Sequence, residues 1–208
     1  MTKSMYDQLN AHGTVAKQRF VETFSGSGLD TDRWNVTTTG NGAATMSDEA
    51  DGGLKITSDS GATGGIMINF NNIRQYSQTG SVCIFVGKRT SASDAQMLGG
   101  LSSNTALNED VASIKDYTGY AGNKQFATAN NGSWQTQDTT VAKSTNYNSY
   151  KIELLSSSVT MSVDGLTEIT NSTQVPDAPV QPFFYASESA GAASAKSAQI
   201  RYMEAYNT

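Results

Sequence analysis

Most of this chain consists of short runs in which apolar and polar residues alternate, separated by Gly, Asn, Asp and Ser. Alternation with a period of two is typical of β-strands that bury one face. In one such run, Tyr150, Ile152 and Leu154 would share a face, while Lys151 and Glu153 would point the other way. About a dozen runs follow one another with almost no helical periodicity, which predicts an all-β, two-sheet antiparallel β-sandwich.

The expected strands are bounded by turn signals. Asp164-Gly165 is typical of a hairpin turn, and 130–134, Asn-Asn-Gly-Ser-Trp, is interpreted as a hairpin tip. All three prolines lie within 176–182, which predicts a stiff connector that cannot join a central strand. The strands that we expect are 20–24, 54–57, 66–70, 81–86, 96–98, 111–114, 150–154, 159–163, 167–170, 183–185 and 198–203.

The first part of the chain differs from the rest. Its apolar residues could line one side of a short helix, but Gly13 would end that helix early. We therefore expect an N-terminal arm or leader, 1–19, followed by one sandwich domain, 20–208. An isolated short helix is unstable in water, so an ordered arm would need a partner or the sandwich to hold it, and the alternative is a mere leader. The arm residues that we expect to contact an assembly are Met5, Tyr6, Leu9 and Arg19.

Composition excludes several classes of function. The net charge is −5 and the 14 basic residues are scattered, which argues against a nucleic-acid partner. No apolar run approaches the ~20 residues of a membrane span, and the N-terminus lacks the apolar stretch of a secretory signal, although a removed signal stays open. The single cysteine, Cys83, excludes an internal disulfide and a cysteine-based zinc site. It lies in an apolar run and is expected to be a small buried hydrophobe.

Several motifs, taken in order, resemble one known family. They are 20–24 (Phe-Val-Glu-Thr-Phe), 29–34 (ending in Arg-Trp), 51–56 (Asp-Gly-Gly-Leu-Lys-Ile), 150–154, 159–165 (ending in Val-Asp-Gly), 183–185 and 200–202. Their order resembles concanavalin A-like jelly-roll domains of the LamG and lectin-glucanase type, and only 87–148 matches poorly. The resemblance implies one concave, often glycan-facing sheet and one convex sheet. This fold hosts glycosidases, lectins, adhesins and virion proteins, so it leaves the function open.

The sequence argues against an enzyme. Glycoside cleavage needs two carboxyl groups about 5–10 Å apart. Glucanases of the resembled family carry acidic residues spaced by two on one strand, and no Glu-x-Asp-x-Glu arrangement occurs here. The only histidine, His12, lies in the leader. Some members of the family bind calcium, but Arg201 and Tyr202 stand where one acidic ligand is expected. We therefore expect no catalytic residue, no metal and no cofactor.

A glycan-binding site is the main small-ligand hypothesis. Sugars pack against exposed aromatic rings, and amide side chains bind their hydroxyl groups. Trp134 follows the expected hairpin tip, which would expose or half-expose its indole, but packing inside the sandwich is the favoured interpretation for a lone Trp beside a turn. The candidate glycan-binding residues are Trp134, Tyr117, Tyr120, Asn130 and Asn131.

The first-ranked functional hypothesis is a non-enzymatic structural protein of a virion, such as a capsid-decoration, fibre or tail-associated protein. The arm would dock on a viral shell or another assembly protein, and the sandwich would face solvent or a host-surface glycan. A homo-oligomer in the virion is expected, with neither nucleic-acid binding nor membrane insertion. The alternative is a secreted or extracellular lectin-like carbohydrate-binding module, and a glycoside hydrolase is the remote alternative.

Overall fold

The described part of the chain consists of strands and their connections. The computed structural model describes residues 19–26, 28–39, 42–46, 52–58, 65–71, 75–91, 95–117, 122–188 and 195–208, with only the backbone of Thr39, Tyr117 and Glu188. No helix that could cross a membrane occurs among these residues. The strands are β1 (Arg19–Glu22), β2 (Asn35–Thr39), β3 (Ala43–Met46), β4 (Leu54–Thr57), β5 (Gly65–Asn69), β6 (Ser81–Arg89), β7 (Ala95–Ser102), β8 (Val111–Tyr117), β9 (Asn123–Asn130), β10 (Ser133–Ala142), β11 (Asn148–Leu154), β12 (Val159–Val163), β13 (Leu166–Asn171), β14 (Gln181–Glu188) and β15 (Ser197–Asn207).

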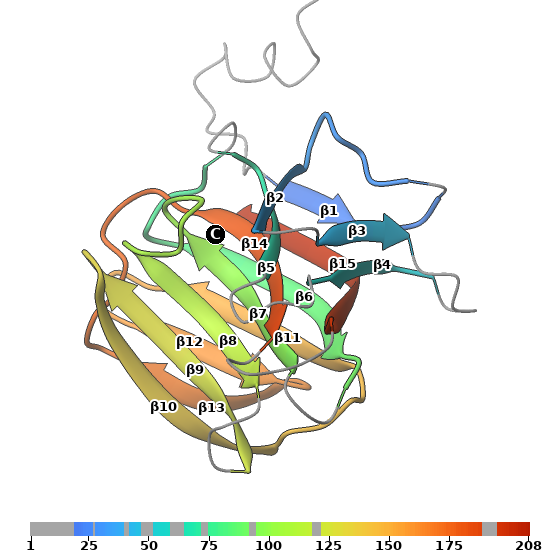
Figure 1. Cartoon of the computed structure of the whole chain (residues 1–208). Helices are drawn as coiled ribbons and strands as arrows, with labels where there is room; N and C mark the ends of the chain where they lie inside the picture. Colours follow the sequence, from blue (N-terminus) through green and yellow to red (C-terminus); the bar gives the residue numbers. More distant parts are fainter. Residues whose placement is uncertain are drawn as a thin grey trace, which may run out of the picture.

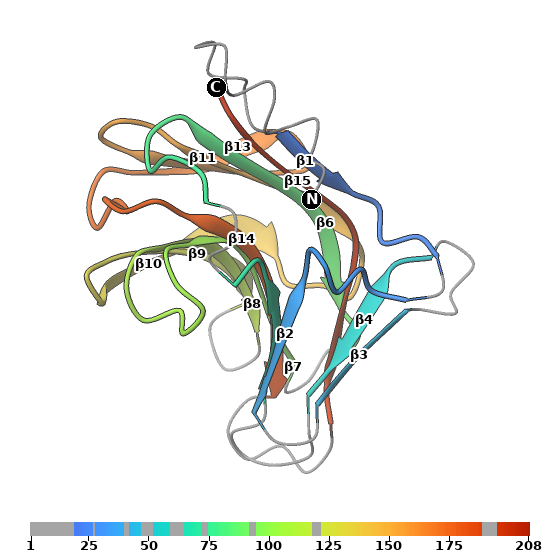
Figure 2. The same cartoon turned by 90° about the horizontal axis from the view of Figure 1, so that it is seen from above.

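These strands form two stacked antiparallel sheets (Figure 1). The outer sheet has the order β13-β12-β11-β6-β15-β4-β3, and β1 also pairs with β15. The inner sheet has the order β10-β9-β8-β7-β14-β5-β2. Figure 2 shows that both sheets are curved, with the outer sheet wrapped around the inner one. The open face of the inner sheet is therefore concave, and the open face of the outer sheet is convex.

The predicted concanavalin A-like sandwich is confirmed, and every expected strand lies at least partly within an observed one. Four strands were missed: β2, β3, β9 and β10. Three of these lie at sheet edges, where polar residues on both faces weaken the alternation. The two hairpin turns are present, since Asn131 and Gly132 (φ 47° and 78°) join β9 to β10, and Asp164 and Gly165 (φ 50° and 83°) join β12 to β13.

The prediction for the proline segment is wrong at one position. Pro182 is the second residue of β14, a strand between β7 and β5 in the inner sheet. It pairs with Leu101 of β7, whereas pairing with β5 begins one residue later at Phe183. Pro182 precedes the ladder between β14 and β5. The start of β14 therefore tolerates a residue without an N–H group.

The space between the sheets is filled by apolar side chains from both. Trp34 is only 1% exposed and packs against Phe20, Phe24 and Phe70, with ring centroids 4.9–5.5 Å apart. Cys83 is fully buried, as predicted, and burial raises the pKa of its thiol. Aromatic pairs at these distances stabilise a core beyond the area that they bury.

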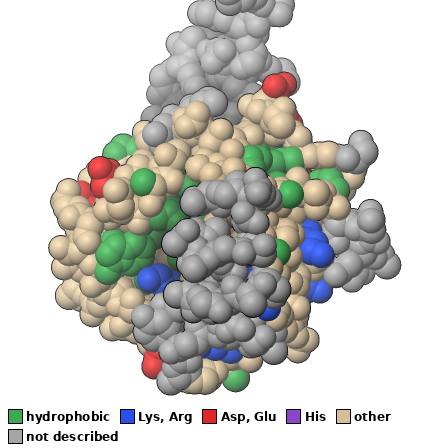
Figure 3. Space-filling view, viewed as in Figure 1, with side chains coloured by type: hydrophobic (Ala, Val, Ile, Leu, Met, Phe, Trp, Pro, Cys, Tyr) green, Lys and Arg blue, Asp and Glu red, His purple; other side chains and the backbone are tan. Residues whose placement is uncertain are grey.

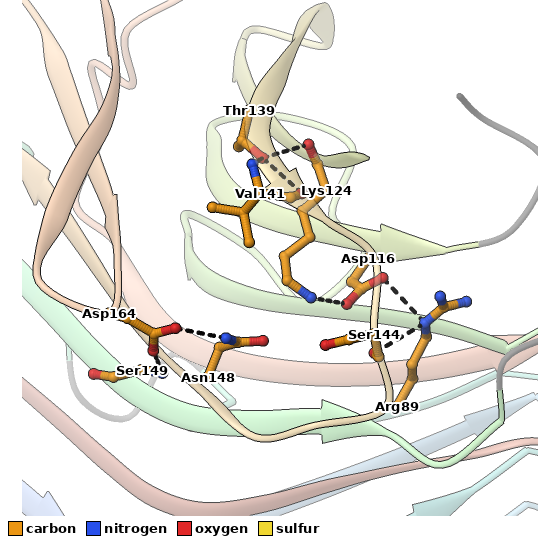
Figure 4. Close-up of polar contacts among 9 residues, drawn as sticks. All are labelled: Arg89, Asp116, Lys124, Thr139, Val141, Ser144, Asn148, Ser149 and Asp164. Atoms are coloured by element: carbon orange, nitrogen blue, oxygen red, sulfur yellow. Dashed lines mark hydrogen bonds and ion pairs between the residues drawn. The ribbon is translucent and has the colours of Figure 1, made fainter. Parts of the chain in front are cut away.

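At one end of the sandwich the core ends in a buried cluster of charges (Figure 4). Asp116 of β8 accepts a 2.6 Å hydrogen bond from Nζ of Lys124 on β9, and Arg89 of β6 lies 3.1 Å away through Nε. All three side chains are at most 4% exposed. Arg89 also donates to the carbonyl oxygen of Ser144. The cluster therefore joins β8 and β9 of the inner sheet to β6 of the outer sheet.

We predict that Asp116→Ala lowers the free energy of unfolding by about 3–5 kcal/mol, because it leaves two buried cations without their shared carboxylate. Urea denaturation followed by circular dichroism measures this loss. The matched control, Lys151→Met, breaks the partly exposed ion pair with Glu153 (2.8 Å) and should cost less than about 1 kcal/mol. Equal losses in the two variants would show that the cluster contributes nothing particular to stability.

Candidate functional site

A groove crosses the concave face of the inner sheet. Its volume is about 560 Å³, and its lining comes from six strands and from the loop that joins β7 to β8. Figure 3 looks onto this face and shows hydrophobic side chains exposed beside basic ones. The described lining residues are Thr37, Gly65, Met67, Leu98, Thr105, Ala106, Leu107, Lys115, Trp134 and Tyr185.

Strand alternation places these side chains on the open face. On β8, Ala112 and Ile114 point into the core, so Lys115 points outward into the groove. On β7, Met97 is a core residue and Leu98 faces the groove, directly opposite Lys115 in the register. Each strand therefore contributes to the core and to the groove through alternate residues.

Trp134 forms one end of this groove. It is the second residue of β10, just after the Asn131-Gly132 turn, and 40% of it is exposed. The Nζ atom of Lys115 lies 4.4 Å from the centroid of the indole ring. Such a cation–π contact contributes ~0.5–1 kcal/mol at an exposed site and holds both side chains at the groove. Of the two alternatives that the sequence left for Trp134, the structure shows an exposed indole and not one packed inside the sandwich.

Tyr185 provides a second aromatic ring, which the sequence did not single out. It lies on β14, which is separated from β10 by three strands, and its ring packs over Gly65 of β5. A side chain at Gly65 would collide with that ring. Four strand spacings of ~4.8 Å, about 19 Å in all, separate β10 from β14, and the register places Tyr185 level with Asp138, four residues along β10 from Trp134. A long ligand could therefore contact both rings if it crossed the strands diagonally.

The loop between β7 and β8 forms a wall of the groove. Leu107 has φ 55° and packs against a small apolar cluster on the open face. The loop is tied together by its own hydrogen bonds, including Asn104 Nδ2 to Asn108 Oδ1 at 2.7 Å. It is also joined to the β9–β10 turn, where the Gly132 N–H donates to the carbonyl oxygen of Glu109 at 3.3 Å. The buried members of the apolar cluster are Met67, Leu98, Val111, Ala129 and Phe183.

The other predicted glycan-binding residues are Asn130, Asn131, Tyr117 and Tyr120. Asn131 lies in the turn and donates to Oδ1 of Asn130, at 2.7 Å. Asn130 is half-buried, and its amide donates to the carbonyl oxygen of Val175, so its groups hold the turn and a neighbouring segment together. Tyr117 ends β8 two residues beyond Lys115, but its side chain lies outside the described residues, as does all of Tyr120.

The predicted arm is mostly outside the described residues. Met5, Tyr6 and Leu9 belong to that part of the chain. Arg19, the last residue of the expected arm, instead begins β1 and pairs with Tyr206 of β15. Its Nε lies 2.8 Å from a carboxylate oxygen of Glu204, on the convex face. Arg19 therefore already takes part in the outer sheet.

Acidic groups are sparse on the described groove surface. None of its described lining residues is acidic, and no three metal-binding side chains come together in the described ranges. Asp138 lies on β10 four residues beyond Trp134 and accepts a 2.6 Å hydrogen bond from Gln125. Asp116 points the other way, into the buried cluster. The described lining thus offers aromatic, aliphatic and hydroxyl groups and one ammonium group.

Comparison with solved structures supports this fold across nearly the whole chain. A β-glucanase of Bacillus licheniformis matches with a TM-score of 0.67 at 15% identity, over 91% of this chain and 98% of that one. A protein described as an immunostimulatory antigen and pseudo beta-1,3-glucanase of Mycobacterium tuberculosis matches with a TM-score of 0.66 at 10% identity, over 91% and 98%. The carbohydrate recognition domain of Emp47p matches with a TM-score of 0.63 at 10% identity, over 91% and 94%. No protein-family model matches the chain, and no curated protein matches it significantly.

These comparisons contradict the first-ranked hypothesis of a non-enzymatic virion protein. The three similar structures are two glucanase-type proteins and a carbohydrate recognition domain. The prediction that the chain is not an enzyme is contradicted by the same finding, since a beta-1,3-glucanase of Mycobacterium marinum also matches. Both predictions relied on the absence of recognisable catalytic motifs, and the virion hypothesis relied also on the expected N-terminal arm. Neither a missing motif nor an arm identifies a partner.

The turn that places Trp134 generates a stability prediction. Gly132 has φ 78°, and an added Cβ would lie 3.0 Å from the carbonyl oxygen of Asn108. Gly132→Ala should therefore lower the free energy of unfolding by ~1–2 kcal/mol, because an L-residue is strained in this conformation. Asn131→Gly, in the same turn, should change it by no more than about 0.5 kcal/mol. Thermal denaturation compares the two, and a neutral Gly132→Ala variant would contradict the described turn.

Proposed function

We propose that the concave groove of the inner sheet binds a polysaccharide chain. The observation that carries this proposal is the exposed indole of Trp134, which lines a groove across a concave sheet. Trp presents a large, rigid apolar surface together with an N–H donor, which suits the flat apolar faces and hydroxyl edges of sugar rings. Carbohydrate binding is also the property common to a glucanase and a carbohydrate recognition domain, two of the similar structures.

The shape of the groove supports a chain rather than a single sugar. Trp134 lies on the edge strand β10 and Tyr185 on β14, so four strand spacings, about 19 Å, separate their strands. The lining between these strands includes the aliphatic side chains of Leu98 and Leu107, and Met67 lies just beyond Tyr185 on β5. Thr37 and Thr105 add hydroxyl groups that can donate to or accept from sugar hydroxyls. A ligand that spans the strands would thus meet an aromatic ring at each side and an apolar floor between them.

Glycoside hydrolysis is the second candidate function, favoured by the glucanases among the similar structures. It needs a pair of carboxyl groups at the bound chain. Asp138 is the described acidic residue that shares the groove face of β10 with Trp134. Reducing-end release from laminarin and mixed-linkage glucan tests this candidate. Release that is abolished by one acidic-residue substitution supports hydrolysis, and intact polymers after long incubation at high protein concentration contradict it.

Trp134→Ala should weaken binding to the polysaccharide at least about tenfold, because buried Trp contacts dominate binding free energy. Isothermal titration against laminarin and mixed-linkage glucan measures the affinity without depending on indole fluorescence. Stability should stay within about 1 kcal/mol of the unsubstituted protein, since the side chain is outside the core.

The matched control is Leu166→Ala. Leu166 is the most exposed large apolar residue described, at 70%, and it lies on β13 of the outer sheet. Its removal should leave the affinity unchanged. An equal effect of both substitutions, or full binding by Trp134→Ala, would contradict a groove that binds through this indole.

A further inference from the structure

One positive charge stands in the groove. Lys115 is the only charged side chain among the described lining residues. It is held between Leu98 of β7 and Gln125 of β9, its partners in the two ladders, and its Nζ lies 4.4 Å from the centroid of Trp134. The position is therefore fixed by strand register on both sides and by the indole above.

This ammonium group has no carboxylate partner among the described residues. The described ion pairs all involve other cations. Asp138, on the same face two strands away, instead accepts a hydrogen bond from Gln125 at 2.6 Å. Lys115 is half-buried, and that burial lowers the pKa of its ammonium group. A partly desolvated cation without a counter-charge is stabilised by an anion that enters beside it.

We propose that the groove is selective for polyuronates, polysaccharides whose sugar rings carry a carboxylate at C6. This inference rests on the proposed polysaccharide binding and names its substrate class. The ring of one uronate residue packs against the exposed part of Trp134, and its carboxylate accepts a hydrogen bond from Nζ of Lys115. Because Lys115 already contacts that indole, the ring and its carboxylate can engage the two side chains together.

General attraction of polyanions does not account for this preference. The protein carries 19 acidic and 14 basic residues, so it repels anionic chains at long range. Highly charged polymers such as nucleic acids need clustered Lys and Arg, whereas the described groove lining holds one cation. Selectivity for a carboxylate must therefore arise from the single contact at Lys115. A uronate suits this site because its charge is attached close to the ring that packs on Trp134.

The test compares laminarin with its C6-oxidised form, which has the same backbone but carries a carboxylate in place of the hydroxymethyl group. Isothermal titration at about 0.15 M salt gives the ratio of the two affinities for the unsubstituted protein, Lys115→Met, Lys115→Arg and the outer-sheet control Lys151→Met. The unsubstituted protein should prefer the oxidised form about tenfold, as expected for one charge-assisted hydrogen bond. Lys115→Met should reduce this ratio to about one, while Lys115→Arg and Lys151→Met retain it.

Each contrary result has a distinct meaning. Equal affinity of the unsubstituted protein for both polymers overturns polyuronate selectivity and leaves polysaccharide binding standing. A preference that survives Lys115→Met overturns the assignment to Lys115. Sulfated laminarin that binds more tightly than the oxidised form overturns the choice of a carboxylate. Binding of none of the three polymers contradicts the proposed function and this inference together.

Discussion

The two sheets approach each other most closely where Phe85 of β6 packs onto the backbone of Gly99 in β7. A Cβ added at Gly99 would lie 2.6 Å from Cζ of the Phe85 ring, so only glycine leaves enough room. The ring is held by Tyr150 and Phe184, with centroids 4.9 and 6.1 Å away. At this position the two sheets, both curved in Figure 2, meet through an aromatic ring that packs on bare backbone.

The same strand, β7, also contributes side chains to the open face of the inner sheet. Leu98 precedes Gly99 and points the other way, into the apolar cluster beneath Leu107. On that face Leu98 contributes to the floor of the groove. The loop that carries Leu107 covers part of this floor and leaves Trp134 and Tyr185 accessible at its sides. A partly covered apolar surface with polar edges is typical of a ligand site.

The sequence predicted the fold because alternation records which face of a strand is buried. It predicted the Asn131-Gly132 turn beside Trp134 for a similar local reason, but it did not decide whether the indole is exposed, because that depends on how the strands pair. It did not single out Lys115 or Tyr185, because their meeting depends on the pairing of strands far apart in the chain and on which sheet is concave. Tyr185 also follows two buried phenylalanines, and its run was interpreted only as a strand. The functional hypothesis failed because it was built on a missing motif and on an expected arm, neither of which identifies a partner.

Charge at the groove and charge on the whole molecule act over different distances. The net charge of −5 opposes an approaching polyanion, but salt at physiological concentration screens this repulsion beyond ~8 Å. The contact proposed at Lys115 forms at hydrogen-bond distance beside the Trp134 indole, where burial weakens screening. Added salt would thus reduce the long-range repulsion more than the local attraction. A lysine without a carboxylate partner in the described groove can therefore favour a carboxylated chain even in an acidic protein, because recognition depends on one partly desolvated contact.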